Sequence, residues 1–347
     1  MGVVICERCG GCSTIADINV DELPFSNCQR TREEFSLKLK SSKKFKKIPM
    51  CTESEYKQVK KKIKEKIINM GAEILNNQNI FELIEKLNPF AKNIQIPENI
   101  IENISFDYID GPLIKFSNGE LYEGGWDNNY KRFGYGVSIN EDGNVFIGLW
   151  ENDYFGKYGA FIQKNGNYYM GQLNNGIAEG KGEMVIKNKM KYNGQFNNDL
   201  PNGQGILENV IDNSIYNGNV RNCLKEGYGE LKYIDGTTYI GYFQNDKFNG
   251  KGKIIFPNGN KYEGGFINGK MGGEGVFTWQ DGIQFFGNFV DNVKQGHGKL
   301  YWNDNKYYEG NWFNNKLHGE GNFHLNGKIT KGKFRFGKII MKEDEIK

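Results

Sequence analysis

The residues with the clearest capacity for chemistry lie at the start of the chain. Gly2 follows Met1 and precedes small or apolar residues, as at the start of an N-myristoylated protein. The usual rule asks for Ser or Thr at position 6, where this chain has Cys6. Cys6, Cys9 and Cys12 would then accept palmitoyl groups, because one myristoyl chain alone gives only marginal membrane binding. We therefore expect lipidation at Gly2, Cys6, Cys9 and Cys12.

The same thiols have two other interpretations. With Cys28 they supply four possible metal ligands, and Cys9-Gly10 resembles a zinc knuckle. A structural zinc site usually needs two paired knuckles, and the sequence offers one. The third interpretation is that these cysteines are incidental. Acylation is the interpretation we favour, so we expect neither a metal nor a cofactor.

A dense run of lysines follows. Residues 38–66 contain twelve lysines against Glu53, Glu55 and Glu65. Each lysine near an anionic membrane surface contributes about 1 kcal/mol, and salt screens the attraction. The predicted lipid contacts are Lys38, Lys40, Lys43, Lys44, Lys46, Lys47, Lys60, Lys61 and Lys62.

A set of catalytic residues is not found in the sequence. There are three histidines, His297, His318 and His324, and the first two lie in or beside the Gly-x-Gly turns, where solvated side chains are common. Cys223 also falls in a turn, and we expect an exposed, neutral thiol there. Neither a phosphate-binding loop of the Walker type nor a Gly-x-Ser-x-Gly elbow occurs. We expect no catalytic residue and no nucleic-acid partner.

The rest of the chain is organised by one phrase, repeated nine times with a step of 23 or 24 residues. It reads aromatic-x-Gly-x-bulky, a polar turn, then Gly-x-Gly. We count the aromatic as position 1; it falls at Tyr122, Phe146, Tyr169, Tyr192, Tyr216, Tyr239, Tyr262, Phe285 and Tyr308. The residues that we expect to form the repeat framework are Tyr122, Gly124, Trp126, Tyr169, Gly171, Gly180, Gly182, Tyr239, Gly241, Gly250, Gly252, Tyr262, Gly264, Gly273, Gly275, Tyr308, Gly310, Trp312, Gly319 and Gly321.

Alternation predicts a β-hairpin for each phrase. Positions 1, 3 and 5 share one face of the first strand, and positions 12, 14, 16 and 18 share one face of the second. Asn-Gly and Asp-Gly pairs such as Asn258-Gly259 predict tight turns, and the other turn, as at 268–271, should be longer. Stacked hairpins then form one long twisted antiparallel sheet with an aromatic, glycine-lined groove. We expect its rings to pack on one another; the alternative is that Trp126, Trp150 or Trp312 faces a partner.

This phrase closely resembles the MORN repeat, Y-x-G-x-W-x-N-G-x-x-x-G-x-G, over about two thirds of the chain. The first copy has an extra residue before Gly134, and the second has Lys157 where the first glycine of the pair belongs. Half units precede and follow the array at 111–119 and 330–337. The resemblance implies a mainly β, elongated solenoid of stacked β-hairpins.

Two helices are predicted ahead of the array. Thr52 and Glu55 form a capping box, and an apolar stripe follows from Tyr56 to Ile74. A short helix should run from Ile80 to Leu87. We expect this region to cap the first hairpin; the alternatives are a coiled coil or a membrane-surface helix.

The predicted segments are a basic, flexible, acylated segment at 1–51, a helical cap and linker at 52–105, the repeats at 106–337 and a tail at 338–347.

Composition and charge agree with a binding protein inside the cell. Residues 1–100 hold 17 Lys and Arg against 13 Asp and Glu, and the remainder is nearly balanced. The absence of a secretory signal and of a long apolar run predicts a reducing, cytoplasmic setting. We expect a non-enzymatic scaffold on the cytoplasmic face of a membrane, binding other proteins or copies of itself.

The resemblance also implies alternatives. MORN arrays occur in cortical cytoskeleton and in the spoke heads of axonemes, so the chain could be a structural component of a cilium, a flagellum or another cytoskeletal assembly. A third hypothesis is a regulatory subunit of a lipid or protein kinase. A lipid anchor distinguishes the membrane hypothesis from the axonemal one.

Overall fold

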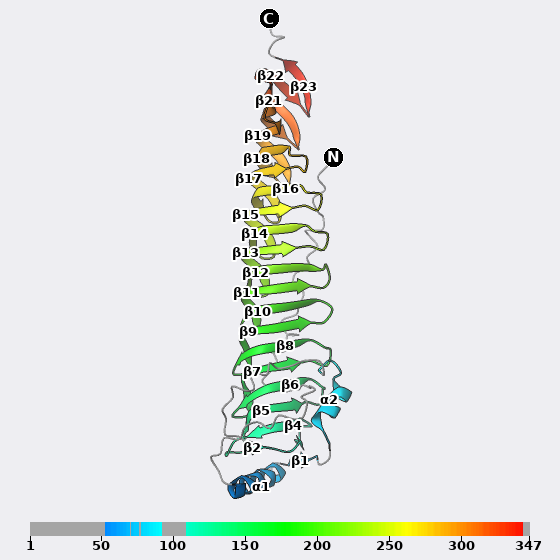
Figure 1. The fold of residues 1–347 in the computed structure, drawn as a ribbon, viewed down its shortest axis with the longest axis vertical. Coiled ribbons are helices and arrows are strands. Elements are labelled where there is room, and N and C mark those ends of the chain that lie inside the picture. Colours follow the sequence, from blue (N-terminus) through cyan, green and yellow to red (C-terminus); the bar gives the residue numbers. More distant parts are fainter. Residues whose placement is uncertain (1–52, 70, 76–77, 92–108, 343–347) are drawn as a thin grey trace. The chain divides into compact units, whose positions relative to one another are not determined.

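The computed structural model describes residues 53–69, 71–75, 78–91 and 109–342. These residues separate into two compact units, an N-terminal unit that ends at Gly203 and a C-terminal unit that begins at Gln204. The predicted fold class is confirmed: within each unit, antiparallel hairpins follow one another in chain order (Figure 1).

The helices are α1 (Glu53–Asn69) and α2 (Ile80–Leu87). The strands that lie wholly in the N-terminal unit are β1 (Glu73–Ile74), β2 (Ile109–Asp110), β3 (Ile114–Lys115), β4 (Leu121–Trp126), β5 (Arg132–Ile139), β6 (Val145–Glu151), β7 (Tyr154–Ile162), β8 (Tyr168–Asn174), β9 (Ile177–Ile186) and β10 (Met190–Asn197). The boundary between the units falls in β11 (Leu200–Asn209). The C-terminal unit contains β12 (Ser214–Arg221), β13 (Leu224–Lys232), β14 (Thr238–Gln244), β15 (Lys247–Ile255), β16 (Lys261–Ile267), β17 (Lys270–Thr278), β18 (Gln284–Val290), β19 (Val293–Asn303), β20 (Lys306–Phe313), β21 (Lys316–Leu325), β22 (Lys328–Arg335) and β23 (Lys338–Lys342).

The hairpin of β14 and β15 shows the geometry of each repeat. Gly241 pairs with Gly252, but the next pair is Phe243 with Phe248, so β15 carries extra residues in a bulge. Gly250 lies in that bulge with φ of +86°. The same shift separates the glycine pair from the following pair in the other aromatic-led hairpins of known register. Because bulges bend a strand and increase its twist, every repeat curls in the same sense.

The prediction of which of the two turns is tight was wrong. In every repeat after the first, the turn inside the repeat is the tight one: Asn245 and Asp246 alone join β14 to β15, both with positive φ (49° and 65°). Asn258-Gly259 instead lies in a five-residue connection, where the Gly259 N–H donates to the Phe256 carbonyl at 2.9 Å. Only the glycine of that pair has positive φ. Two-residue turns with both residues left-handed match the twist of a hairpin, and Asn-Asp satisfies this requirement as Asn-Gly does.

The face that carries the repeated aromatic, the inner face, is the core of both units. The nine aromatics at position 1 are at most 1% exposed. Tyr239 stacks on Phe248 at a ring-centroid distance of 3.7 Å and meets Phe243 and Phe266 edge-on at 5.1 Å. The prediction that rings pack on one another is therefore confirmed. Trp126 and Trp150 are 1% exposed and Trp312 is 6% exposed, so the alternative that they face a partner is wrong.

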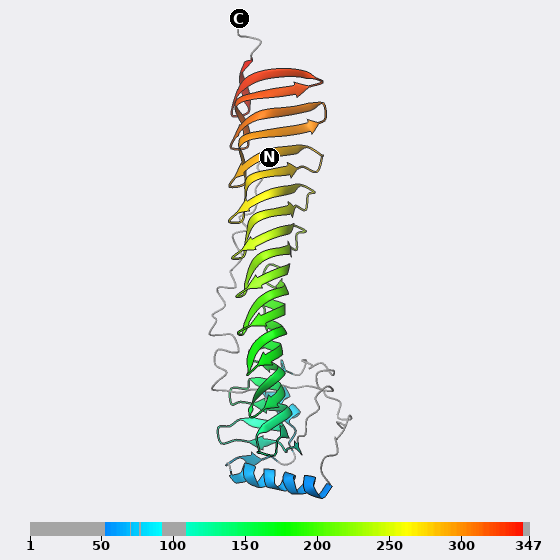
Figure 2. The same ribbon diagram turned by 90° about the vertical axis from the view of Figure 1, so that its left-hand side faces the viewer.

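The two helices lie in the N-terminal unit. α2 has the predicted bounds, and the Asn79 side chain caps it by accepting the Phe81 N–H at 2.8 Å. Its buried residues Ile80 and Ile84 join a cluster with Val137, Ile139, Val145, Ile147, Ala160 and Ile162, on the opposite, outer face of β5 to β7. α1 contacts β1 and β2 at the end of this sheet (Figure 2). Within the described residues, neither helix is long and apolar enough to span a bilayer.

Candidate interaction surface

The residues predicted for membrane contact fall into two groups. Gly2, Cys6, Cys9, Cys12 and the lysines from Lys38 to Lys47 lie outside the described residues, and so do Thr52 and Cys28. Lys60, Lys61 and Lys62 lie on α1, where Lys61 and Lys62 are exposed. Lys61 forms an i,i+4 ion pair with Glu65 at 3.9 Å, and pairs of this exposed kind contribute little to stability.

The glycines of the repeat have two distinct roles. A Cβ on Gly252 would meet the Tyr239 ring, with Cζ and Cε2 at 2.7 Å, so the position-14 glycine leaves room for the aromatic. The position-12 glycines are Gly180, Gly203, Gly227, Gly250, Gly273, Gly296 and Gly319, and they have φ between +67° and +116°. We predicted that they line the groove; they are instead needed for the left-handed backbone of the bulge.

Tyrosine at position 1 has a further role beyond filling the core. The Tyr239 hydroxyl donates to the Tyr242 carbonyl at 2.9 Å, and the Tyr262 hydroxyl donates to the Gly265 carbonyl at the same distance. Five other repeats make this bond to the residue three positions on. The carbonyl lies where the bulge interrupts the ladder, so the hydroxyl supplies a partner that the neighbouring strand does not. Burial raises the pKa of Tyr262 and Tyr308 to about 12.

A series of Asn and Asp side chains links consecutive hairpins at their tight turns. The second turn residue accepts the N–H of a residue 21 positions earlier, and its own N–H donates to the carbonyl of that same residue. We call these contacts the turn ladder. Its side-chain bonds join Asp153 to Arg132, Asp199 to Ala178, Asp246 to Lys225, Asn292 to Met271 and Asn315 to Lys294, at 2.7 to 2.9 Å.

Cys223 occupies the same second turn position, with φ of 68°. We expected it to be exposed, and this is wrong: it is 8% exposed. The second residue of these turns points in toward the sheet, as Asp199 and Asp246 do. Desolvation, with a smaller effect of Asp246, raises the pKa of the Cys223 thiol to about 12. The thiol is therefore inert rather than solvated, and Cys223→Ser should cost about 1 kcal/mol by burying a hydroxyl.

In the described repeats, three cations enter the inner face at the first core position after the turn inside the repeat. Arg132 binds Asp153 at 3.3 Å and also contacts Glu120, and Lys225 binds Asp246 at 3.4 Å. Lys294 has Asn315 in the corresponding place. Other repeats fill this position with Phe155, Ala178, Pro201, Phe248, Met271 or Leu317. The position is thus apolar in most repeats, and a cation buried there needs a carboxylate or another hydrogen-bonding partner.

The outer face of the C-terminal unit carries an aromatic row that the sequence prediction missed. The centroid of the Phe286 ring lies 5.6 Å from that of Tyr301, which lies 5.2 Å from that of Tyr307. Tyr307 stacks on His324 at 4.0 Å with nearly parallel rings. We call Phe286, Tyr301, Tyr307 and His324 the outer ring row. They come from β18, β19, β20 and β21, so the row crosses four adjacent strands. The sequence did contain a signal for this row. Phe286, Tyr301 and Tyr307 are aromatic at positions where the repeat pattern predicts a polar residue, and each stands next to another aromatic residue in the sequence.

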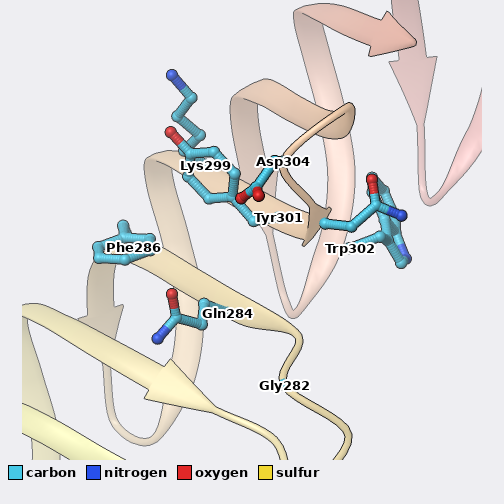
Figure 3. A pocket seen from close by; sticks show the side chains of 8 residues that line it. Gly282, Gln284, Phe286, Lys299, Tyr301, Trp302 and Asp304 are labelled. Atoms are coloured by element: carbon cyan, nitrogen blue, oxygen red, sulfur yellow. The ribbon is translucent and has the colours of Figure 1, made fainter. Parts of the chain in front are cut away.

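Polar groups flank the outer ring row. Lys299 Nζ lies 4.4 Å from the centroid of the Tyr307 ring and 3.1 Å from a Glu309 carboxylate oxygen. A shallow pocket of about 320 Å³ opens beside Phe286 and Tyr301, with Gln284 and Asp304 at its margin (Figure 3). Trp302 follows Tyr301 in β19 and points away from it (Figure 3). Flat rings beside balanced charges suit contact with a protein segment.

The histidines differ in environment. His297 is exposed, as predicted. His324 belongs to the outer ring row, and His318 packs against Phe336 and Phe313 at ring-centroid distances of 5.0 and 5.5 Å. Both are packed side chains, so the expectation that His318 is a solvated turn residue is wrong.

Comparison with known proteins identifies the repeat. Seven consecutive segments match the MORN repeat, at 169–190, 192–209, 216–238, 239–261, 262–284, 285–307 and 308–326. The chain therefore carries MORN repeats from residue 169 to residue 326. The hairpins that begin at Tyr122 and Phe146 lie outside these matches, yet their glycines pair in the same way, Gly124 with Gly136 and Gly148 with Gly159.

No curated protein sequence matches the chain. Among solved structures, it is similar to the TCP domain of SAS-4 (dCPAP) from Drosophila melanogaster in complex with a proline-rich motif of Ana2 (15% identity, 45% of this chain and 85% of that one, TM-score 0.30). It is also similar to the TCP10 domain of Danio rerio CPAP in complex with a peptide of STIL (13% identity, 68% of this chain and 98% of that one, TM-score 0.32).

Proposed function

We propose that this MORN-repeat chain is a non-enzymatic scaffold that binds a protein partner through the outer ring row. The observation that carries the proposal is the contrast between the outer faces of the two units. In the N-terminal unit that face is apolar over β5 to β7, and α2 covers it there. In the C-terminal unit no described helix lies on it, and the rings of Phe286, Tyr301, Tyr307 and His324 form a continuous row. Grouped, accessible aromatic side chains are typical of protein-binding surfaces.

The second half of the proposal concerns location. Gly2, Cys6, Cys9 and Cys12 would carry acyl chains, and the lysines between Lys38 and Lys62 would add attraction to anionic lipid on the cytoplasmic face of a membrane. Support comes from the sequence pattern and from the exposure of Lys61 and Lys62 on α1. Acylation and a polybasic segment together give stable attachment where either alone is marginal.

Partner binding is tested by a double substitution, Tyr301→Ser with Tyr307→Ser. The matched control is Tyr228→Ser with Tyr242→Ser, since these two tyrosines also form a ring pair on the outer face, at 5.5 Å, and are 54% and 52% exposed. Proteins recovered by crosslinking in the native cell are quantified for each. Loss of a specific partner in the first variant only is the expected result. Equal partner recovery from both variants contradicts the proposal.

Location is tested by myristate-analogue labelling and fractionation of the wild type and Gly2→Ala. We expect the wild type to be labelled and to pellet with membranes, and Gly2→Ala to lose both properties. An unlabelled wild type that stays in a detergent-insoluble pellet would favour the alternative, a structural component of an axoneme or another cytoskeletal assembly. The two tests are independent, so the partner site can hold even if the anchor does not.

A further inference from the structure

Lys294 occupies a position at which the other two cations, Arg132 and Lys225, each have a carboxylate partner. Its side chain enters the inner face beside the tight turn between β18 and β19, in register with Phe289. Its Nζ lies 4.6 Å from the centroid of the Trp279 ring, 5.4 Å from that of Phe285 and 5.8 Å from that of Trp312. The ammonium group is thus surrounded by ring faces.

The internal repeat supplies the comparison. At the equivalent position, Lys225 meets the carboxylate of Asp246, and the two side chains are 7% and 5% exposed. Asn315 holds that place for Lys294: its Oδ1 accepts the Lys294 N–H at 2.8 Å but carries no charge. Within the described residues, Lys294 makes no ion pair, and the nearby Asp291 is bound to Lys270 at 3.0 Å.

An ammonium group in this setting loses hydration without gaining a carboxylate. Desolvation lowers the pKa of Lys294 to about 8 from the ordinary value of 10.5. Near neutral pH the fraction of free amine is then roughly 300 times that of an exposed lysine. Lys294 is half-buried rather than sealed, so a reagent can reach it from solvent.

We propose that Lys294 is a modification site that accepts an acyl group from an activated donor such as a thioester. The Nζ lone pair attacks the acyl carbonyl carbon, the carbon–sulfur bond breaks, and the thiolate leaves with the bonding electrons. Nζ releases its proton to solvent, and a neutral amide results without oxidation or reduction. The rings of Trp279, Phe285 and Trp312 accommodate an uncharged amide at lower cost than an unpaired ammonium group.

Chemical acetylation of the full chain by acetyl-coenzyme A at pH 7.5 tests the proposal. Occupancy at each lysine is measured by peptide mass spectrometry over time, with the exposed Lys316 as reference. Nucleophilicity falls with pKa, which offsets part of the gain in free amine, so Lys294 should react about tenfold faster than Lys316. A rate at or below that of Lys316 would overturn the proposal.

Asn315→Asp is the matched variant, because Asp153, Asp199 and Asp246 already occupy the same turn position. It should restore a carboxylate beside Lys294, slow acetylation there to the Lys316 rate or below, and leave Lys316 unchanged. An unchanged Lys294 rate in this variant would also overturn the proposal. Lys294→Met mimics the neutral product and should raise the urea midpoint of the C-terminal unit. A lower midpoint would show that the pocket prefers the charged amine.

Discussion

Asp246 holds Lys225 by three contacts across two consecutive hairpins. The Asp246 side chain accepts the Lys225 N–H at 2.8 Å and lies 3.4 Å from its Nζ. The Asp246 N–H donates to the Lys225 carbonyl at 3.1 Å. Both side chains are almost fully buried, so the pair is an ionic part of the core. The pair ties the turn between β14 and β15 to the preceding hairpin, and the other turn-ladder contacts do the same at their own turns. Each repeat therefore depends on its neighbour.

Asp246→Asn should destabilise the C-terminal unit. Asn retains the backbone bonds and the left-handed turn, as Asn292 and Asn315 do, but leaves Lys225 buried without a carboxylate. Breaking a buried pair in this way costs about 3 kcal/mol. Repeats open locally, so the measurement is amide hydrogen exchange of 214–255, followed by urea unfolding of the full chain.

Two further variants separate charge from packing in that experiment. Adding Lys225→Met to Asp246→Asn removes both charges and should recover most of the loss, because an apolar pair of similar size is often neutral. Lys270→Met removes an exposed ion pair and should change stability by less than about 1 kcal/mol. Equal losses for Lys270→Met and Asp246→Asn would show that the buried pair has no special importance.

Asp199 is the reverse of Lys294, which is a cation without a carboxylate partner. It is a turn-ladder carboxylate, but the residue at the neighbouring core position is Ala178, which carries no charge. Burial raises the pKa of Asp199 to about 6, although the Ala178 N–H lowers it in part. A carboxyl group whose pKa is raised on folding destabilises the fold when it ionises. This penalty is absent below pH 3.8, grows between pH 3.8 and 6, and is complete above pH 6.

Asp199→Asn should therefore stabilise the N-terminal unit at pH 7.5, by about 1 kcal/mol after allowance for solvent screening. Unfolding midpoints of the two proteins, measured from pH 4 to pH 8, should diverge as the pH rises and converge near pH 4. A constant difference across that range would assign the effect to something other than ionisation.

Alternation along the strands was enough to predict the inner face. The inner-face positions of Tyr239, Gly241 and Phe243 were predicted correctly. Side chains alternate between the two faces of a strand, so burying one face determines the face of every residue. Contacts between repeats could not be predicted in this way. The turn ladder joins residues 21 apart, and its geometry depends on a bulge that adds residues to one strand. The sequence pattern gave position 12 the same role as position 14, although Gly250 is needed for its positive φ and Gly252 for space.

The outer ring row was missed for a related reason. The repeat pattern leaves the outer positions variable, so Phe286, Tyr301 and Tyr307 resemble ordinary substitutions when each is considered alone. Strand register brings them together, since Tyr301 pairs with Tyr307 and Tyr307 with His324. Cys223 was misplaced because the turn was expected to be loose, whereas a two-residue turn directs its second side chain inward.

Gly241→Val tests the close approach of paired strands. A Cβ on Gly241 would lie 2.5 Å from Gly252 Cα and 2.8 Å from the Lys251 carbonyl oxygen, and backbone atoms cannot move aside. We expect a loss of about 3 kcal/mol in the free energy of unfolding. Gly236→Asn is the control, because nothing lies within 4 Å of its Cβ position and Asn tolerates its left-handed φ of +89°. If both variants unfold at the same urea concentration, the close glycine pairing does not limit stability.

Cys223 should resist alkylation in the folded protein. With its pKa raised to about 12, the thiol holds almost no thiolate at pH 8, and its 8% exposure limits access. Iodoacetamide should modify Cys223 at least about 100-fold more slowly in native buffer than in urea, where the pKa returns to its ordinary range. The readout is mass spectrometry of the peptide that contains residue 223.

Asn222→Cys places a second thiol at the exposed first turn position. That thiol should react promptly in native buffer, which shows that reagent reaches the turn. Rapid native labelling of Cys223 itself would mean that the second turn residue points to solvent, and the inward direction assigned to the turn-ladder side chains would then be wrong at this hairpin.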